Sequence, residues 1–204
     1  MAARRGLIVD YGGVLTTDVF ASFRAFCEAE GLEPDAVRDR FRSDPEARGL
    51  LEALEVGRLT EAEYEPRLAA VLGVAPEGLV DRLFGGMQPD LEMIEGVRAA
   101  RRAGVRTGLL SNSWGDDRYD RAQLAELFDA WVISGEVGLR KPDPAIYALA
   151  AERLELPPEA CVFVDDLPGN LKPAAAIGMA TILHGGDAEA TLRRLGTLLG
   201  VSLR

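Results

Sequence analysis

Cysteine and histidine are scarce in this chain of 204 residues, which has two of the first and one of the second. Cys27 and Cys161 form no C-x-x-C motif and have no histidine at ligand spacing, so the common Cys/His zinc sites are excluded. Both thiols are expected to be reduced and buried, in a helix and at the start of a strand. The only histidine, His184, follows the last predicted strand, and we expect a loop residue there without a catalytic role.

The chain also lacks a long apolar run and an excess of positive charge. Near the N-terminus the apolar stretch covers only residues 7–9, which is too short for a signal sequence or a membrane span, so a cytoplasmic protein without a membrane partner is expected. Its 23 basic and 33 acidic residues give a net charge of −10, which repels nucleic acid. With 48% apolar and 27% charged residues, the composition is typical of a globular domain.

Short apolar runs predict five strands, at 7–9, 105–110, 131–133, 161–164 and 180–183. They are almost continuously apolar rather than alternating, which is typical of parallel strands that are buried on both faces. Helix-length segments at 119–128, 143–154 and 168–177 separate the later strands. We therefore predict an α/β fold with a Rossmann-like parallel sheet, formed by residues 1–17 and 88–204.

The segment 18–87 has no convincing strand and is rich in Ala, Leu, Glu and Arg. Glycines and prolines divide it into four or five predicted helices, and Thr60 with Glu63 predicts a capping box at the start of one of them. An all-helical cap, inserted after the first strand, is the simplest interpretation; a separate interaction module is the alternative. Trp114 is expected either to wall a substrate pocket or to pack against this cap.

Chemically informative residues stand at or near the ends of predicted strands. Asp10, Ser111 and the pair Asp165 and Asp166 end strands, and Lys141 lies in the sequence LRKPDP. The carboxyl ends of parallel strands meet at one edge of a sheet, where ligands bind in such folds. A nucleophilic carboxylate, a hydroxyl, a lysine and an acidic pair for a metal are together what phosphoryl transfer through an aspartate needs, so they indicate a phosphatase.

These motifs resemble the haloacid dehalogenase superfamily, in the branch that carries a helical cap after the first strand. The stretches SGEVGLRKPDPAIY and VFVDDLPGNLKPAAAIGMATIL are especially similar to the N-terminal phosphatase domain of soluble epoxide hydrolases and to sugar-phosphate phosphatases. The resemblance implies that Asp10 is the nucleophile that forms an aspartyl phosphate. It also implies that Ser111 and Asn112 bind the phosphoryl group. Lys141 would be a catalytic and substrate-binding residue that neutralises the Asp10 carboxylate and the phosphate as they approach each other.

The resemblance further implies a Mg²⁺ ion. Asp166 would bind it directly, Asp10 and the Gly12 carbonyl would complete the protein ligands, and Asp165 would lie close by. Asn170 would either orient this loop or simply begin a helix. The implied partner is a small phosphorylated metabolite.

Gly12 departs from the family pattern, because most phosphatases of the superfamily have a second aspartate at this position, two residues after the nucleophile. That aspartate protonates the leaving oxygen, and glycine has no proton to give. Relatives with Gly or Asn there resemble sugar-1-phosphate phosphatases, whose leaving group is a weaker base. Three explanations for Gly12 are open: the substrates have good leaving groups, another residue or water replaces the acid, or the site turns over slowly. Asp18, Asp116 and Asp117 are nearby acids that we expect to be solvated.

Two other functions compete with the phosphatase. A 2-haloacid dehalogenase displaces halide from carbon without a metal, but such enzymes lack the acidic pair seen at Asp165 and Asp166. A catalytically weak phosphate-binding or partner-binding module is the other alternative, because Gly12 replaces the usual acid.

Overall fold

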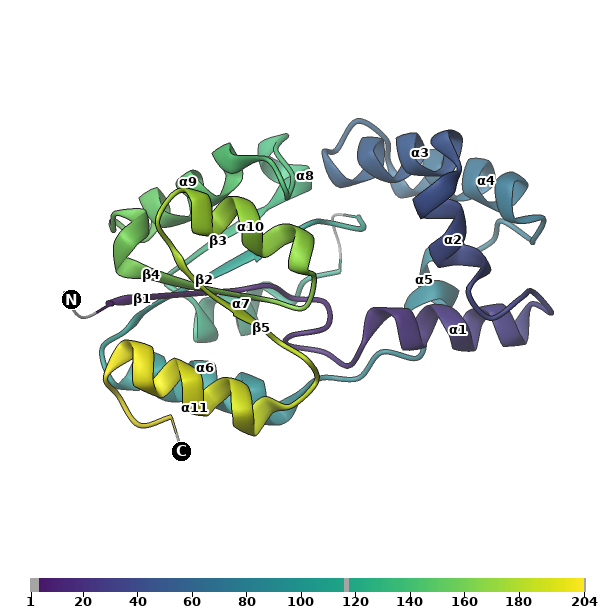
Figure 1. The fold of residues 1–204 in the computed structure, drawn as a ribbon. Coiled ribbons are helices and arrows are strands. Elements are labelled where there is room, and N and C mark those ends of the chain that lie inside the picture. Colours follow the sequence, from purple (N-terminus) through teal and green to yellow (C-terminus); the bar gives the residue numbers. More distant parts are fainter. Residues whose placement is uncertain (1–3, 116–117, 204) are drawn as a thin grey trace.

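The computed structural model describes residues 4–115 and 118–203, and within them a five-stranded parallel sheet lies between two layers of helices (Figure 1). The strand order is β3-β2-β1-β4-β5, and all four neighbouring pairs are parallel. The strands are β1 (Gly6–Val9), β2 (Arg106–Ser111), β3 (Ala130–Ile133), β4 (Cys161–Asp165) and β5 (Ala180–Leu183). The predicted α/β fold class is therefore confirmed.

The apolar runs form strands because each can bury side chains on both faces of the sheet. In β1, Leu7 and Val9 belong to one hydrophobic cluster, whereas Ile8 between them belongs to the cluster on the opposite face. In β2, Leu109 and Leu110 divide between the same two clusters. This two-sided burial explains why the sequence shows continuous apolar runs instead of alternation.

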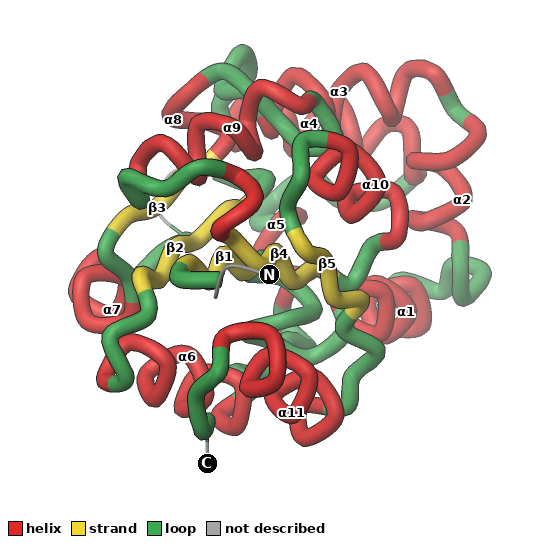
Figure 2. The backbone as a smooth tube through the Cα atoms, turned by 60° about the vertical axis from the view of Figure 1, so that its left-hand side comes forward, coloured by secondary structure: helices red, strands yellow, loops and turns green. Residues whose placement is uncertain are grey.

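Helices cover both faces of the sheet (Figure 2). One face packs against α6 (Leu91–Arg102), α7 (Arg121–Leu127) and α11 (Ala188–Leu199). The other face packs against α9 (Pro144–Arg153) and α10 (Pro168–Ala176), while α8 (Ser134–Val137) follows β3 and η1 (Pro158–Ala160), a short 3₁₀ helix, precedes β4. The helix predicted at 119–128 is shorter, because the Asp120 side chain caps its start by accepting from the amides of Ala122 and Gln123.

A helical block follows β1 and has a hydrophobic cluster of its own. It consists of α1 (Val19–Ala29), α2 (Ala36–Ser43), α3 (Pro45–Glu55), α4 (Glu61–Leu72) and α5 (Leu79–Phe84). The predicted capping box is present: Thr60 accepts from the Glu63 amide, and the Glu63 carboxylate accepts from the Thr60 amide. That side-chain exchange satisfies two amides that the helix itself leaves unpaired.

The helical block lies beside the carboxyl ends of the strands (Figure 1). The two connecting segments run next to each other, with an antiparallel bridge between Thr16 and Pro89 and a hydrogen bond of 2.8 Å from the Thr17 amide to the Gln88 carbonyl. The chain therefore leaves the sheet and returns to it at one place. The exact domain boundaries, 18–87 and the remainder, stay a prediction.

The scarce residues take structural positions. Cys27 in α1 and Cys161 in β4 are free and buried, as predicted. His184 lies in the loop after β5, is buried, and its Nδ1 atom is 2.9 Å from Thr191 Oγ1. None of the helices among the described residues combines the length and the apolar character that a membrane span requires.

Candidate active site

Asp10 lies where β1 ends. Its amide donates to the Val164 carbonyl of β4 at 2.9 Å, and its Oδ1 atom accepts from the Tyr11 amide at 2.7 Å. The turn that follows needs glycine, because Gly13 has a φ of +70° and a Cβ there would overlap the Asp166 carboxylate. The backbone thus fixes the Asp10 carboxylate at the centre of the sheet edge, where the residue is 8% exposed.

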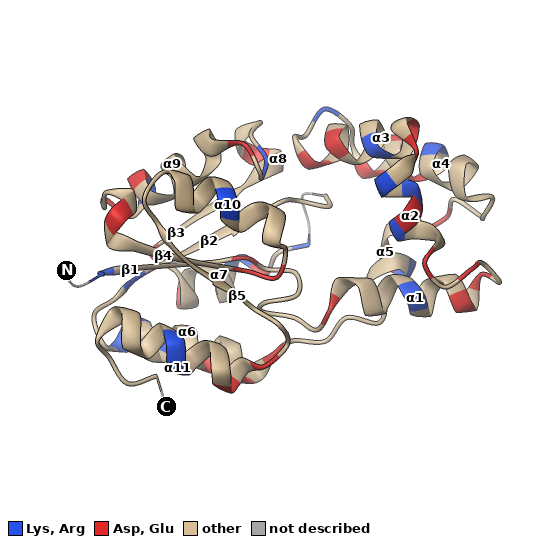
Figure 3. Cartoon of the chain, viewed as in Figure 1, with Lys and Arg blue, Asp and Glu red and all other residues tan. Residues whose placement is uncertain are grey.

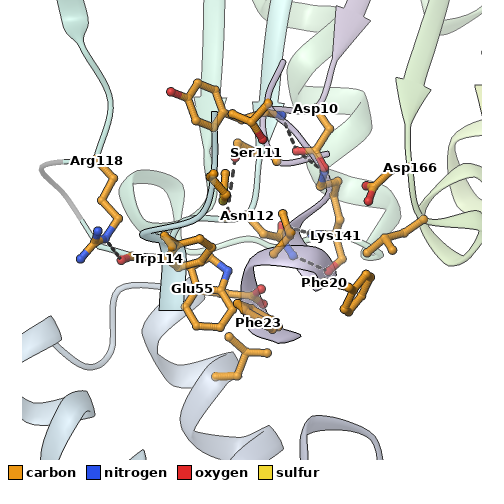
Figure 4. Close-up of a pocket in the computed structure, with 18 of the residues that line it drawn as sticks. Asp10, Phe20, Phe23, Glu55, Ser111, Asn112, Trp114, Arg118, Lys141 and Asp166 are labelled. Carbon is orange, nitrogen blue, oxygen red and sulfur yellow. Dashed lines mark hydrogen bonds and ion pairs between the residues drawn. The ribbon is translucent and has the colours of Figure 1, made fainter. Parts of the chain in front are cut away.

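Lys141 connects two carboxylates beneath the cavity, as Figure 4 shows for Asp10. Its Nζ atom is 2.8 Å from Asp10 Oδ1 and 2.8 Å from Asp165 Oδ2. Asn112 positions the lysine backbone, because its Oδ1 accepts from the Lys141 amide at 2.8 Å and its Nδ2 donates to the Lys141 carbonyl at 3.1 Å. Burial alone would lower the lysine pKa, but the two carboxylates outweigh it and raise the pKa, so the ammonium stays charged.

Asp165 and Asp166 are neighbours with different surroundings. The Asp165 carboxylate is fully buried and accepts from Lys141, from the Leu167 amide at 2.8 Å, and from Asn170 Nδ2 at 3.0 and 3.1 Å. The Asp166 side chain lines the cavity and has no ion pair among the described residues. Burial and the nearby Asp165 charge raise the pKa of Asp166 to about 6. Asp165 is thus saturated with donors, and Asp166 is available to a ligand.

The acidic cluster fits a divalent cation. Asp10, Asp165 and Asp166 each have a carboxylate oxygen within 4.8 Å of the other two, and of the three only Asp165 already has both oxygens occupied by hydrogen-bond donors. Burial raises the pKa of Asp10 to about 8 despite Lys141, since the other two carboxylates add negative charge. Three carboxylates face one ammonium, and oxygen ligands with an excess of negative charge are what Mg²⁺ requires.

Ser111 is the last residue of β2 and lines the cavity with Asp10. Its Oγ atom is 2.8 Å from the hydroxyl of Tyr119, a residue that the sequence analysis did not identify. Burial raises the pKa of Tyr119, so this phenol keeps its proton and can donate it to Ser111. The serine hydrogen then has the Asn112 carbonyl as a distant acceptor at 3.4 Å, and it can turn to a ligand oxygen.

Of the three acids discussed as a source of the missing proton, two fall outside the described residues and one is an exposed helix cap. Gly12 lines the cavity and has an ordinary φ. Asp18 is an exposed side chain that caps α1 by accepting from the Phe20 amide at 2.8 Å and pairs with Arg24. Asp116 and Asp117 fall outside the described residues.

A cavity of about 640 Å³ lies between the sheet edge and the helical block. Its floor contains Asp10, Ser111, Asn112, Lys141 and Asp166, while its other side is rich in aromatic rings (Figure 4). Trp114 has both of its expected roles. It lines the cavity, and the centre of its ring lies 4.9 Å from that of Phe84 in the helical block. The sequence did not predict that aromatic rings of α1, α2 and α5 line the cavity, because only tertiary packing brings these helices together.

A family model described as haloacid dehalogenase-like hydrolase matches residues 5–178. The chain belongs to this family. The predicted family and the prediction of an enzyme are both confirmed.

Curated relatives of this haloacid dehalogenase-like hydrolase include phosphatases. Bifunctional epoxide hydrolase 2 of Mus musculus is 31% identical over 97% of the chain, and that of Sus scrofa 28% over 98%. The alignments cover 39% and 40% of these relatives, so the chain spans about two fifths of their length. Glyceraldehyde 3-phosphate phosphatase of Methanopyrus kandleri is 33% identical over 59% of the chain and 52% of its own length. These relatives support a phosphatase role.

Solved structures of haloacid dehalogenase-like hydrolases share the fold. A predicted HAD-like family hydrolase from Porphyromonas gingivalis has a TM-score of 0.69 and 25% identity, covering 95% of this chain and 98% of that one. A HAD family enzyme from Bacteroides thetaiotaomicron, solved with magnesium and inorganic phosphate, has a TM-score of 0.65 and 21% identity over 90% and 96% of the two chains.

Proposed function

We propose that this hydrolase is a Mg²⁺-dependent phosphatase of small organic phosphomonoesters, with residues 18–87 as a cap over the site. The observation that carries the proposal is the position of Lys141, whose Nζ atom is 2.8 Å from both Asp10 and Asp165 at the cavity floor. A buried ammonium that is held against a carboxylate lets a phosphate dianion approach that carboxylate with less repulsion.

The reaction would proceed in two displacements at phosphorus. The Asp10 carboxylate attacks phosphorus in line, its oxygen forms the new O–P bond, and the bond to the ester oxygen breaks. Water then attacks the aspartyl phosphate, releasing inorganic phosphate and regenerating the carboxylate. During both steps Lys141 and the Ser111 hydroxyl contact phosphoryl oxygens, with Tyr119 holding the serine at 2.8 Å.

The residues fit a magnesium ion, which Asp10 and Asp166 would hold. We assign Asp165 the task of positioning Lys141 and Asn170, because both of its oxygens already accept hydrogen bonds. The Gly12 carbonyl completes the proposed protein ligands. When bound, Mg²⁺ supplies positive charge that offsets the charge of the transferring phosphoryl group.

Gly12 leaves the departing oxygen without a side-chain acid in the usual place. The leaving group must then depart as an anion or take a proton from water, so esters of acidic alcohols, phenols, enols and acids react fastest. Gly12 alone is enough to explain this preference for acidic leaving groups, without a replacement acid elsewhere in the site.

The test uses purified protein with acetyl phosphate and 4-nitrophenyl phosphate, with and without Mg²⁺, and measures released phosphate. Turnover that requires Mg²⁺ and is lost in Asp10→Asn supports the proposal. Halide release from 2-chloropropionate in EDTA would instead identify a dehalogenase. Phosphate binding without turnover of either ester would identify a binding module.

A further inference from the structure

Five aromatic rings form one continuous side of the cavity, which we call the aromatic wall: Phe20, Phe23, Phe41, Phe84 and Trp114. The Trp114 ring centre lies 4.9 Å from Phe84, 5.8 Å from Phe41 and 5.8 Å from Phe23, with interplanar angles of 80°, 75° and 59°. Edge contacts of this kind hold the rings in place. The wall is therefore a fixed apolar surface suited to a flat apolar group.

Polar groups near the aromatic wall are largely committed to protein partners. The Glu55 carboxylate pairs with Arg140 Nε at 2.5 Å, and burial raises its pKa. Arg118 pairs with Glu61 at 2.7 Å and with Asp81 at 2.9 Å. A sugar would bury several hydroxyl groups here with few free partners, and unpaired buried hydroxyls are costly. The leaving group that fits this side of the cavity is a ring without many hydroxyls.

Arg42 is a different kind of group at the exposed margin of the same cavity. Arg38 and Arg42 lie four residues apart on α2 and both line the cavity, on a helix that carries charges of both signs (Figure 3). Arg38 pairs with Asp35 at 3.1 Å, and Arg40 pairs with Asp44 at 3.3 Å. Within residues 4–115 and 118–203, the Arg42 side chain has neither an ion pair nor a hydrogen bond. Its planar guanidinium is suited to a carboxylate.

We infer that the substrates are phosphate esters of phenols whose ring carries a second anionic group, held by Arg42. The inference rests on the proposed phosphatase function and narrows it. Three observations carry it: Gly12 favours a leaving group as acidic as a phenol, the aromatic wall accepts a flat ring, and Arg42 is a cation without a protein partner at the cavity margin. Sugar phosphates satisfy at most the first of these conditions.

The experiment compares kcat/KM for 4-carboxyphenyl phosphate, for its neutral counterpart 4-carbamoylphenyl phosphate, and for glucose 1-phosphate, with acetyl phosphate as the reference. The ion pair with Arg42 should favour the charged phenyl ester by about fivefold, the size expected for a partly exposed pair, and this factor is measured against the same ratio in Arg42→Gln because the neutral ester has the better leaving group. Both phenyl esters should exceed glucose 1-phosphate by at least about tenfold.

Two variants of Arg42 and one control assign the preference to this residue. Arg42→Gln should lower the ratio of kcat/KM for the charged ester to that for the neutral ester by about fivefold, and Arg42→Glu should lower it further, because a carboxylate then faces a carboxylate. The control, Arg40→Gln, changes an arginine of the same helix that does not line the cavity, and it should keep the wild-type ratio.

The outcomes separate this inference from the proposed function. If acetyl phosphate and all the esters resist hydrolysis, the phosphatase itself is wrong. If acetyl phosphate is hydrolysed but glucose 1-phosphate exceeds the phenyl esters, or the ratio of charged to neutral ester is the same in wild type and Arg42→Gln, the inference alone is overturned. A wild-type preference that persists in Arg42→Glu would overturn the role of Arg42.

Discussion

The two sides of the cavity differ in their side chains, which are ionic on the sheet side and mainly aromatic on the helical side. On the sheet side, Lys141 and Asp10 are buried ionic groups held by backbone and side-chain hydrogen bonds, Asp10 where β1 ends and Lys141 in the loop between α8 and α9. On the helical side, Phe41 and Trp114 belong to a packed group of rings, and the nearby arginine side chains are partly or fully exposed. Charges that must act on phosphorus need fixed positions, and a sheet edge provides them. We infer that the sheet side determines the chemistry and the helical side the choice of ester.

The largest effect should come from the sheet side. Asp10→Asn removes the nucleophile but keeps the shape of the side chain, so kcat should fall at least about 1000-fold while the circular-dichroism spectrum is unchanged. The control is Asp39→Asn, which changes an exposed aspartate on α2 that does not line the cavity. Activity within tenfold of wild type in Asp10→Asn would mean that the chemistry lies elsewhere.

Metal removal is the next test of the sheet side. EDTA should abolish most turnover, Mg²⁺ should restore it, and Ca²⁺ should restore it poorly because its longer, less regular coordination misplaces the reacting groups. Asp166→Asn should raise the Mg²⁺ concentration for half-maximal activity by at least about tenfold. Glu95→Gln, an exposed acid on α6, serves as the control. Full activity of the metal-free protein would contradict the proposed ligands.

The sequence predicts the sheet side of the cavity better than the helical side. The five strands and the convergence of Asp10, Ser111 and Asp165 were predictable, because parallel strands end at one edge and strand propensity is local. The aromatic wall was not predictable, since its rings come from three helices and a loop whose packing is a tertiary property. The Tyr119 contact to Ser111 was missed for the same reason, although a tyrosine eight residues after the serine was visible.

Gly12→Asp tests whether the leaving group departs without an acid. The φ of Gly12 is ordinary, so the backbone tolerates a side chain, but the new Cβ would lie 3.0 Å from Val19 Cγ2 and the valine side chain must shift by a few tenths of an ångström. The wild-type kcat should depend steeply on leaving-group pKa, and the variant should accelerate alkyl esters most, by up to about 100-fold. A wild-type rate independent of leaving-group pKa, with chemistry shown to be rate-limiting, would mean that another residue supplies the proton.

Phe41→Leu addresses the helical side. The substitution keeps an apolar side chain but removes the ring contacts to Phe23 and Trp114 at 6.3 and 5.8 Å. The ratio of kcat/KM for phenyl phosphate to that for acetyl phosphate should fall by about tenfold, because only the larger ester reaches the aromatic wall. An equal loss of kcat/KM for both substrates would show that the helical side affects the chemistry as well as the choice of ester.

The smallest effect should come from His184, a buried group on the sheet side that does not line the cavity. Burial lowers its pKa below the usual 6.5 even though Asp90 and Asp187 favour the charged form. The unfolded chain therefore takes up the proton first as pH falls below 6.5, and the stability associated with neutral His184 is lost as pH falls toward its folded-state pKa. In chemical denaturation between pH 8 and pH 5, the stability of wild type relative to His184→Gln should decrease as pH falls. A constant difference would contradict the lowered pKa, and a change in kcat at pH 8 would mean that this histidine takes part in the chemistry after all.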